Sequence, residues 1–120
     1  MSKRILIVDD SASMRNVLGA ILRDAGYEVT EAVDGRDALT RLQSPPDLLI
    51  TDFNMPHMNG LQLTQIARAL PQCKQMPIFM LTTETEGSKR QSARAAGATS
   101  WIVKPFQPQQ LLAVVQKVLG

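Results

Sequence analysis

Short apolar runs alternate with stretches of helical periodicity along this chain. Runs of strand length lie at residues 4–8, 28–33, 47–51, 77–81 and 99–103. Between the first two runs, apolar side chains recur every three or four residues, which is the spacing of one face of a helix. A similar spacing follows each later run, so the pattern predicts five strands that alternate with five helices.

Turn-forming residues mark the ends of the predicted helices. Gly26 closes the first helix, because glycine readily takes the left-handed conformation that ends helices. Asp34 is placed to cap the second helix, and prolines 45–46 end it. Pro71 ends the third helix, and Pro108 begins the fifth. The fourth helix, at 88–96, carries little apolar surface, so we expect it to be packed shallowly.

This alternation predicts the fold class. Strands joined by helices pair in parallel through right-handed crossovers, and nearly continuous apolar strands indicate a sheet covered on both faces. We therefore predict an α/β fold, a doubly wound (βα)5 three-layer sandwich with a five-stranded parallel sheet. The 120 residues fit one domain, and we expect a single domain over 1–120 without a separate output domain.

Composition narrows the functional classes. With 44% hydrophobic and 20% charged residues, the chain is typical of soluble globular proteins. Its apolar runs are far shorter than the roughly 20 residues needed to cross a bilayer, and the N-terminus lacks a signal sequence, so we expect a cytoplasmic protein. Cys73 is the only cysteine, which excludes an internal disulfide. The net charge of +2 comes from scattered basic residues, a pattern that argues against nucleic-acid binding.

Acidic residues follow two of the predicted strands. Asp9 and Asp10 end the first strand, and Asp52 ends the third. In doubly wound sheets, ligands bind at the carboxyl ends of the strands. Two carboxylates about 5 Å apart at an effective dielectric of about 20 repel by about 3 kcal/mol, so this set needs a cation. Oxygen ligands favour Mg²⁺. Singly, each acid, or Ser11, would serve equally well as a helix cap.

Asp52 has the features of a phosphoryl acceptor. A carboxylate can attack phosphorus and hold the phosphoryl group as a mixed anhydride, provided that fixed charges and donors match the phosphoryl oxygens. Thr82 and Lys104, at the ends of the fourth and fifth strands, supply a hydroxyl and a positive charge. The predicted magnesium ligands are Asp10, Asp52 and the backbone carbonyl of Asn54, with Asp9 acting through water.

Simpler interpretations of these residues stay open. Thr82 or Thr83 is equally suited to cap the fourth helix, and Lys104 to be an ordinary solvated lysine. The peptide bond between Lys104 and Pro105 can be cis or trans. About one in twenty bonds that precede proline is cis in folded proteins. The metal and phosphoryl hypotheses depend on the whole set.

The combination of motifs resembles a known family. Asp9-Asp10, Asp52 followed by Asn-Met-Pro, Thr82, and Lys104-Pro105-Phe106 occur in the order and spacing of the receiver domain of two-component response regulators. The resemblance spans nearly the whole chain and is strongest to stand-alone chemotaxis regulators. It implies a flavodoxin-like fold and a Mg²⁺-dependent phosphoacceptor, not a conventional enzyme, that assists its own phosphorylation and slow dephosphorylation.

The resemblance also assigns roles. It implies that Asp52 accepts a phosphoryl group from a phosphohistidine on a sensor kinase such as CheA. Asp9 and Asp10 are then the acidic metal pair, Thr82 the switch hydroxyl, and Lys104 the cation that contacts the phosphoryl group. The implied output surface is formed by the fourth helix, the fifth strand and the fifth helix.

Trp101 stands at the family's switch aromatic position, where chemotaxis regulators usually carry tyrosine. Tryptophan is larger and offers only an indole N–H, so we expect its burial to be less complete, and a plain packing role is an equal alternative. Because Lys89, Arg90 and Arg94 make the fourth helix basic, we expect an acidic or amphipathic partner peptide. The resemblance implies a monomeric protein whose output partner is the flagellar motor switch or another motility component.

Other functions remain open alternatives. Haloacid-dehalogenase-type phosphatases also use an aspartate nucleophile, but they place a second aspartate two positions later as acid and base. Here that residue is Asn54, which cannot take a proton. His57 is the only histidine and is expected to face solvent, and Glu84 is placed to tune the access of water to Asp52. A phosphate sink or an inactive receiver that acts as a scaffold also fits these residues.

Overall fold

The computed structural model describes residues 2–83 and 87–120, and Glu84 lies outside them. The strands are β1 (Arg4–Val8), β2 (Glu28–Ala32), β3 (Leu48–Asp52), β4 (Ile78–Thr82) and β5 (Ser100–Val103). The helices are α1 (Ala12–Asp24), α2 (Gly35–Arg41), α3 (Gly60–Ala69), α4 (Gly87–Ala96) and α5 (Pro108–Leu119), with a short 3₁₀ helix η1 (Pro71–Cys73) after α3.

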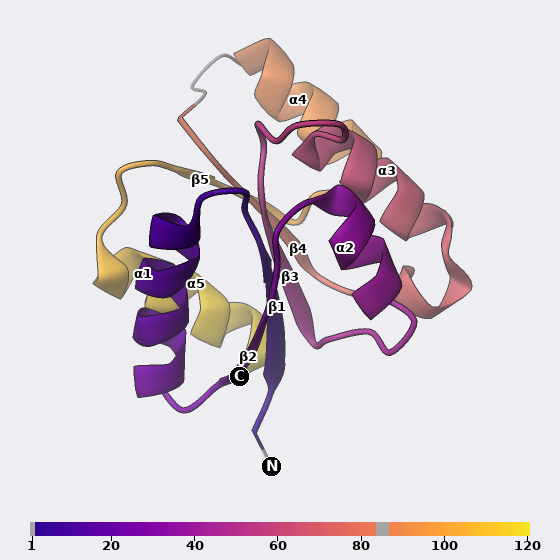
Figure 1. Ribbon diagram of the computed structural model, residues 1–120. Coiled ribbons are helices and arrows are strands. Elements are labelled where there is room, and N and C mark those ends of the chain that lie inside the picture. The colour runs from indigo at the N-terminus through magenta and orange to yellow at the C-terminus, as the bar shows by residue number, and fades with distance from the viewer. Residues whose placement is uncertain (1, 84–86) are drawn as a thin grey trace.

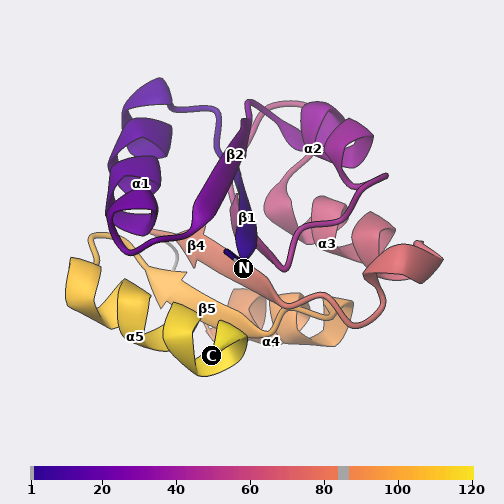
Figure 2. The same ribbon diagram turned by 90° about the horizontal axis from the view of Figure 1, so that it is seen from below.

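The strands form one parallel sheet in the order β2-β1-β3-β4-β5. Helices α1 and α5 cover one face of the sheet, and α2, α3 and α4 cover the other (Figures 1 and 2). This arrangement confirms the predicted doubly wound α/β sandwich. The chain leaves β1 first toward β2 and later toward β3, so the strand order reverses between β1 and β3. Ligands of such folds bind at that point, beyond the carboxyl ends of the strands.

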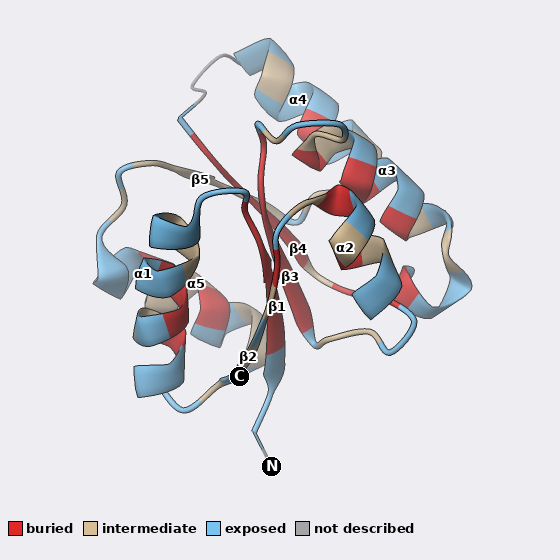
Figure 3. Cartoon of the chain, in the orientation of Figure 1, coloured by how far each residue is buried: buried red, intermediate tan, exposed pale blue. Residues whose placement is uncertain are grey.

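The central strands are buried along most of their length (Figure 3), and their alternate residues supply two apolar layers. Ile5 and Ile7 of β1 pack with α1 and α5, whereas Leu6 and Val8 of the same strand pack with α2 and α3. All four side chains are buried, as the alternation of strand side chains between faces requires. Burial on both faces makes the central strands a rigid base for whatever lies at their ends.

The periphery of the sandwich is less tightly packed. Ala93 is the one buried residue in the described part of α4, so the expected shallow packing of that helix is confirmed. Two residues that fit the helical apolar pattern are nevertheless exposed, Val17 by 50% and Ile66 by 39%. The buried residues of the same helices include Leu18 and Leu22 in α1 and Leu63 and Ala67 in α3, so the apolar spacing is wider than the buried face. In the described part of the chain, no helix has the length and apolar character needed to span a membrane.

The predicted turn residues adopt their expected roles. Ser11 caps α1 by accepting a hydrogen bond from the Met14 backbone N–H at 3.2 Å, and Asp34 caps α2. Gly26 has a φ of 95° after α1. Thr82 is the last residue of β4, and Thr83 after it is not helical, so Thr82 does not directly precede a helix. The interpretation of Thr82 as a helix cap is therefore wrong.

Candidate functional site

Three carboxylates meet at the carboxyl ends of β1 and β3. The parallel register pairs Val8 with Thr51, so Asp9 and Asp52 follow side by side on neighbouring strands. One carboxylate oxygen from each of Asp9, Asp10 and Asp52 lies within 4.8 Å of the others. Asp9 is 1% exposed and Asp52 is 8% exposed, whereas Asp10 faces solvent. The cluster therefore has a buried floor and an open side.

Lys104 brings a positive charge to this cluster from the end of β5, the edge strand next to β4. It follows β5 directly, and its Nζ lies 3.1 Å from Oδ1 of Asp52 and 3.5 Å from Oδ2 of Asp9. Its backbone N–H donates to the Thr82 carbonyl at 2.7 Å, which fixes the chain beside the end of β4. The bond between Lys104 and Pro105 is cis. With 16% of its side chain exposed, Lys104 is no ordinary solvated lysine.

The electrostatic balance of the site is unfavourable to the Asp52 carboxylate. Burial, followed by repulsion from Asp9, raises the pKa of Asp52 above its ordinary value, and the hydrogen bond and charge of Lys104 oppose this only in part. Desolvation and a neighbouring like charge both disfavour an ionised acid. One lysine does not compensate three carboxylates, so a further cation would stabilise the charged site.

The donor set fits a magnesium ion. All the side-chain ligands are carboxylate oxygens, and Asp10 on the open side leaves room for the water molecules that Mg²⁺ retains. Asn54 lies exposed in the loop after β3, and coordination by its carbonyl stays a prediction. His57 is also exposed there, with a φ of 71°, as expected for a histidine that faces solvent.

Thr82 lies next to the acidic cluster on the neighbouring strand. The register pairs Asp52 with Leu81 and Thr82 with Val103, so Thr82 and Lys104 stand beyond Asp52 on successive strands. Thr82 is fully buried. The switch role of Thr82 stays a prediction.

An aromatic contact that the sequence analysis missed connects Asp52 to Trp101. Phe53, which follows Asp52 directly, is 7% exposed, and its ring meets that of Trp101 edge to face at 5.8 Å between centroids. Lys89 Nζ of α4 lies 5.9 Å from the same ring. Trp101 is half-buried, so the expected incomplete burial is confirmed. A bulky apolar residue directly after Asp52 was the available signal for this contact.

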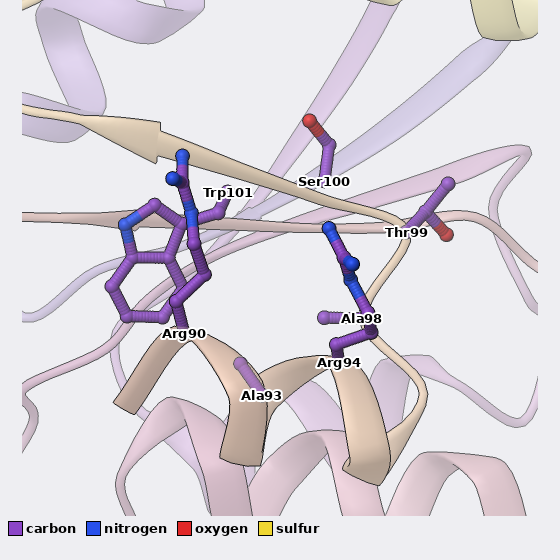
Figure 4. A pocket seen from close by; sticks show the side chains of 7 residues that line it. All are labelled: Arg90, Ala93, Arg94, Ala98, Thr99, Ser100 and Trp101. Carbon is purple, nitrogen blue, oxygen red and sulfur yellow. The ribbon is translucent and has the colours of Figure 1, made fainter. Parts of the chain in front are cut away.

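A shallow pocket separates α4 from β5 beside Trp101. Arg90 and Arg94 rise from α4 toward the strand, and the indole of Trp101 lies beside Arg90 (Figure 4). Ala93, between the two arginines, forms the apolar floor. The pocket thus combines two guanidinium groups with an aromatic face, a set that favours acidic groups attached to apolar ones.

Comparisons with known proteins agree with this geometry. Residues 5–116 match the family model described as the response regulator receiver domain. The chain is 44% identical to the chemotaxis protein CheY1 of Helicobacter pylori over 98% of this chain and 97% of that protein. Its fold superposes with a TM-score of 0.94 on the chemotaxis protein CheY4 of Vibrio cholerae, which is 47% identical, with 98% and 99% of the two chains covered.

A solved structure with lower sequence identity to this chain contains a metal ion. The receiver domain of a sensor histidine kinase from Pseudomonas aeruginosa is 29% identical and has a TM-score of 0.91, with 100% of this chain and 99% of that chain covered. That structure has a magnesium ion coordinated in its active-site cleft.

Proposed function

The chain belongs to the response regulator receiver domain family, and we propose that it is a phosphorylation-activated regulator in a chemotaxis pathway. The observation that supports this proposal best is the approach of the Lys104 ammonium to a buried Asp52 carboxylate inside an acidic cluster. A receiver domain is a phosphoacceptor and not a conventional enzyme.

The site is arranged for transfer to Asp52. A carboxylate oxygen of Asp52 attacks the phosphorus of a phosphohistidine on a kinase, the P–N bond breaks, and its electron pair stays on the imidazole nitrogen, which takes up a proton. Lys104 and Thr82 stabilise the phosphoryl oxygens. Magnesium held by Asp9, Asp10, Asp52 and the Asn54 carbonyl supplies further positive charge when it is bound.

The product is expected to persist long enough to be recognised by a partner. Two positions after Asp52, where a phosphatase of the haloacid dehalogenase type carries its acid and base, this chain has the exposed Asn54. An amide cannot activate water by taking its proton. The site therefore favours a signalling acyl phosphate over rapid hydrolysis.

Phosphorylation then changes the surface formed by α4, β5 and α5. The phosphoryl group adds negative charge and acceptor oxygens at Asp52, which draws Thr82 and Lys104 toward it. Trp101 packs beside Phe53 under α4, so a shift of Thr82 allows its ring to repack. A partner that prefers one arrangement shifts the equilibrium by its difference in affinity for the two states.

The output partner is proposed to be an acidic, amphipathic segment of a motility component such as the flagellar motor switch. The pocket with Arg90, Arg94 and Trp101 supports this chemistry. Arg90→Glu should weaken binding of the activated protein to such a peptide by at least about tenfold, because a reversed charge faces the acidic groups. Binding unchanged by this substitution would argue against the assignment of this face.

Mass spectrometry tests the central claim. Incubation with acetyl phosphate and Mg²⁺ should add one phosphoryl mass to the wild-type protein, and chelation of the metal should prevent it. Asp52→Asn should remove this addition, whereas the control Asp24→Asn, at an exposed position that ends α1, should retain it. Equal labelling of Asp52→Asn would refute the assignment.

A second experiment separates a signal carrier from a passive scaffold. Wild-type protein activated with beryllium fluoride and Mg²⁺ is compared with Asp52→Asn for capture of its partners. A regulator binds a different partner set in the two forms. Identical sets would favour a scaffold, and phosphorylation without any state-specific partner would favour a phosphate sink.

A further inference from the structure

Arg15 of α1 reaches back to the loop that carries the acidic pair. Its Nη1 donates to the backbone carbonyl of Asp9 at 2.6 Å. Only 16% of the Arg15 side chain is exposed, and its own backbone N–H donates to the carbonyl of the N-cap residue Ser11. The guanidinium is thus anchored on the first turns of the helix and directed at the peptide bond between Asp9 and Asp10.

Glu31 on β2 holds this guanidinium in place. Its Oε1 lies 3.3 Å from Nε of Arg15, while its Oε2 lies 3.2 Å from Nη2 of Arg23, which follows Arg15 by about two turns of α1. Gly19 makes room for this arrangement, because a Cβ there would lie 2.8 Å from Nη1 of Arg23. One carboxylate therefore orients two arginines, of which only Arg15 reaches the acidic loop.

The contacts around Asp9 explain why the Arg15 hydrogen bond matters. The Asp9 N–H donates to the Ala32 carbonyl, its Oδ1 accepts from the Ser11 N–H, and its Oδ2 faces Lys104. Asp10 differs, since its carboxylate is exposed and has no side-chain partner among the described residues. The direction of the Asp10 side chain consequently depends on the peptide bond whose oxygen Arg15 holds.

We infer that Arg15 is a positioning residue for the cation site: by holding the Asp9 carbonyl, it aims the Asp10 carboxylate at the place where the cation binds. This inference rests on the magnesium site of the proposed function. Groups behind metal ligands commonly determine metal affinity by fixing the orientation of the ligands. Arg15 would do so through the backbone and not by contact with the metal.

Whether substitution of Arg15 raises or lowers the affinity for Mg²⁺ distinguishes a positioning role from a purely electrostatic one. Arg15→Met removes a positive charge near three carboxylates, so Coulomb attraction alone predicts tighter Mg²⁺ binding. If Arg15 positions Asp10, Mg²⁺ binding should instead weaken by about tenfold. Arg15→Lys keeps the charge but lacks the planar fork that reaches both Asp9 and Glu31, and it should weaken binding by about threefold.

Arg23→Met provides the matched control. It makes the same chemical change on the same helix and removes a contact to the same Glu31 carboxylate, but Arg23 does not contact the acidic loop. Its Mg²⁺ affinity should change by less than about twofold, because an exposed charge further from the site is screened. Thermal unfolding of every variant in the presence of a chelator shows how much stability each substitution costs.

Calorimetric titration with Mg²⁺ alone decides the outcome. Weaker binding in Arg15→Met and Arg15→Lys, with Arg23→Met near wild type, supports the inference. Unchanged or tighter binding in Arg15→Met overturns it, and if that variant does not fold, unchanged binding in Arg15→Lys overturns it. A wild-type protein that binds Mg²⁺ but takes up no phosphoryl group would refute the proposed function while leaving this comparison decisive.

Discussion

Strands β4 and β5 lie side by side in the sheet, yet they are packed very differently. Every residue of β4 is buried, whereas every residue of β5 is only partly buried. The helices above them differ in the same way, since α3 buries four residues and α4 buries only Ala93 in its described part. The region that holds Asp52 is tightly packed, and the region beside it is loosely held.

This difference indicates how a small chemical change at Asp52 can alter a surface. Elements with few buried apolar contacts open and shift at low cost in free energy, and switching elements are drawn from them. In the proposed function, the carboxylates need fixed positions for phosphoryl transfer, and the buried strands β1 and β3 provide them. A partner surface on α4 and β5 benefits from the opposite property.

The largest expected effect is a change in the free energy of unfolding, measured for one substitution in α3 and one in α4. Leu63→Ala in α3 should cost about 3 kcal/mol of unfolding free energy, because Leu63 is fully buried and a cavity would remain. Arg94→Ala in α4 should cost less than about 0.5 kcal/mol, as an exposed position does. Urea unfolding measures both values. Similar costs would mean that α4 is held as firmly as α3.

A second prediction concerns Lys104, which follows β5 but contacts Asp52 at the end of β3. Lys104→Met removes the charge that competes with a cation for the carboxylates. Affinity for Mg²⁺ should therefore rise by about fivefold, or about 1 kcal/mol, when the protein is not phosphorylated. Calorimetry tests this, with Lys74→Met, at an exposed lysine after η1, as the control. Weaker Mg²⁺ binding would show that Lys104 mainly organises the site.

The packed region is the part that sequence alone predicts well. The apolar runs predict the strand ends within one residue. Asp9, Asp52, Thr82 and Lys104 lie at or just after the ends of four of these strands, which places them at one edge of the sheet. The length and composition of the apolar runs suffice to predict these strands, because a segment that is apolar throughout fits a strand buried on both faces of a sheet. The actual strand ends differ slightly, since pairing with β4 extends β3 through Asp52.

The loose region and the supporting contacts were harder to predict. The contact between Phe53 and Trp101, and the network of Arg15, Glu31 and Arg23, join segments that only the sheet register brings together. Val17 likewise fits the apolar spacing of α1 but is 50% exposed. Helical spacing identifies an apolar face but does not give its width.

The pH dependence of stability should reveal how much the ionised Asp52 carboxylate, buried in the packed region, destabilises the folded protein. Its pKa is raised above the ordinary value of 3.8 by burial and by Asp9. Between that value and the raised pKa, the folded protein binds more protons than the unfolded chain, so stability falls as the pH rises through this window. Above the window the cost is fully present, and below pH 3.8 it is absent.

Asp52→Asn removes this charge while Asp9 remains available to Lys104. Without metal, its melting temperature at pH 7 should therefore exceed that of the wild type by about 2–4 °C. The difference should shrink as the pH is lowered toward 4, and Mg²⁺ should reverse it by stabilising the wild type alone. A variant less stable than the wild type at pH 7 would show that the Lys104 pair outweighs burial.

The smallest effect is expected at the contact between the two regions. The edge-to-face contact of Phe53 with Trp101 is worth about 0.5–1 kcal/mol beyond area burial. Trp101, the only tryptophan, should change its emission more with beryllium fluoride and Mg²⁺ than with Mg²⁺ alone. Phe53→Leu keeps an apolar side chain but removes the ring, so the extra response to the phosphate mimic should become smaller.

Phe106→Leu is the control for this last substitution, because Phe106 follows β5 but packs against the α1 and α5 layer. It should leave the extra emission change intact. If Phe53→Leu and Phe106→Leu respond alike, the signal reaches Trp101 through Thr82 without help from the ring beside it. If only Phe53→Leu loses the response while Asp52 still accepts a phosphoryl group, the residue after the nucleophile transmits the switch, and the loosely packed region responds through direct contact with the packed one.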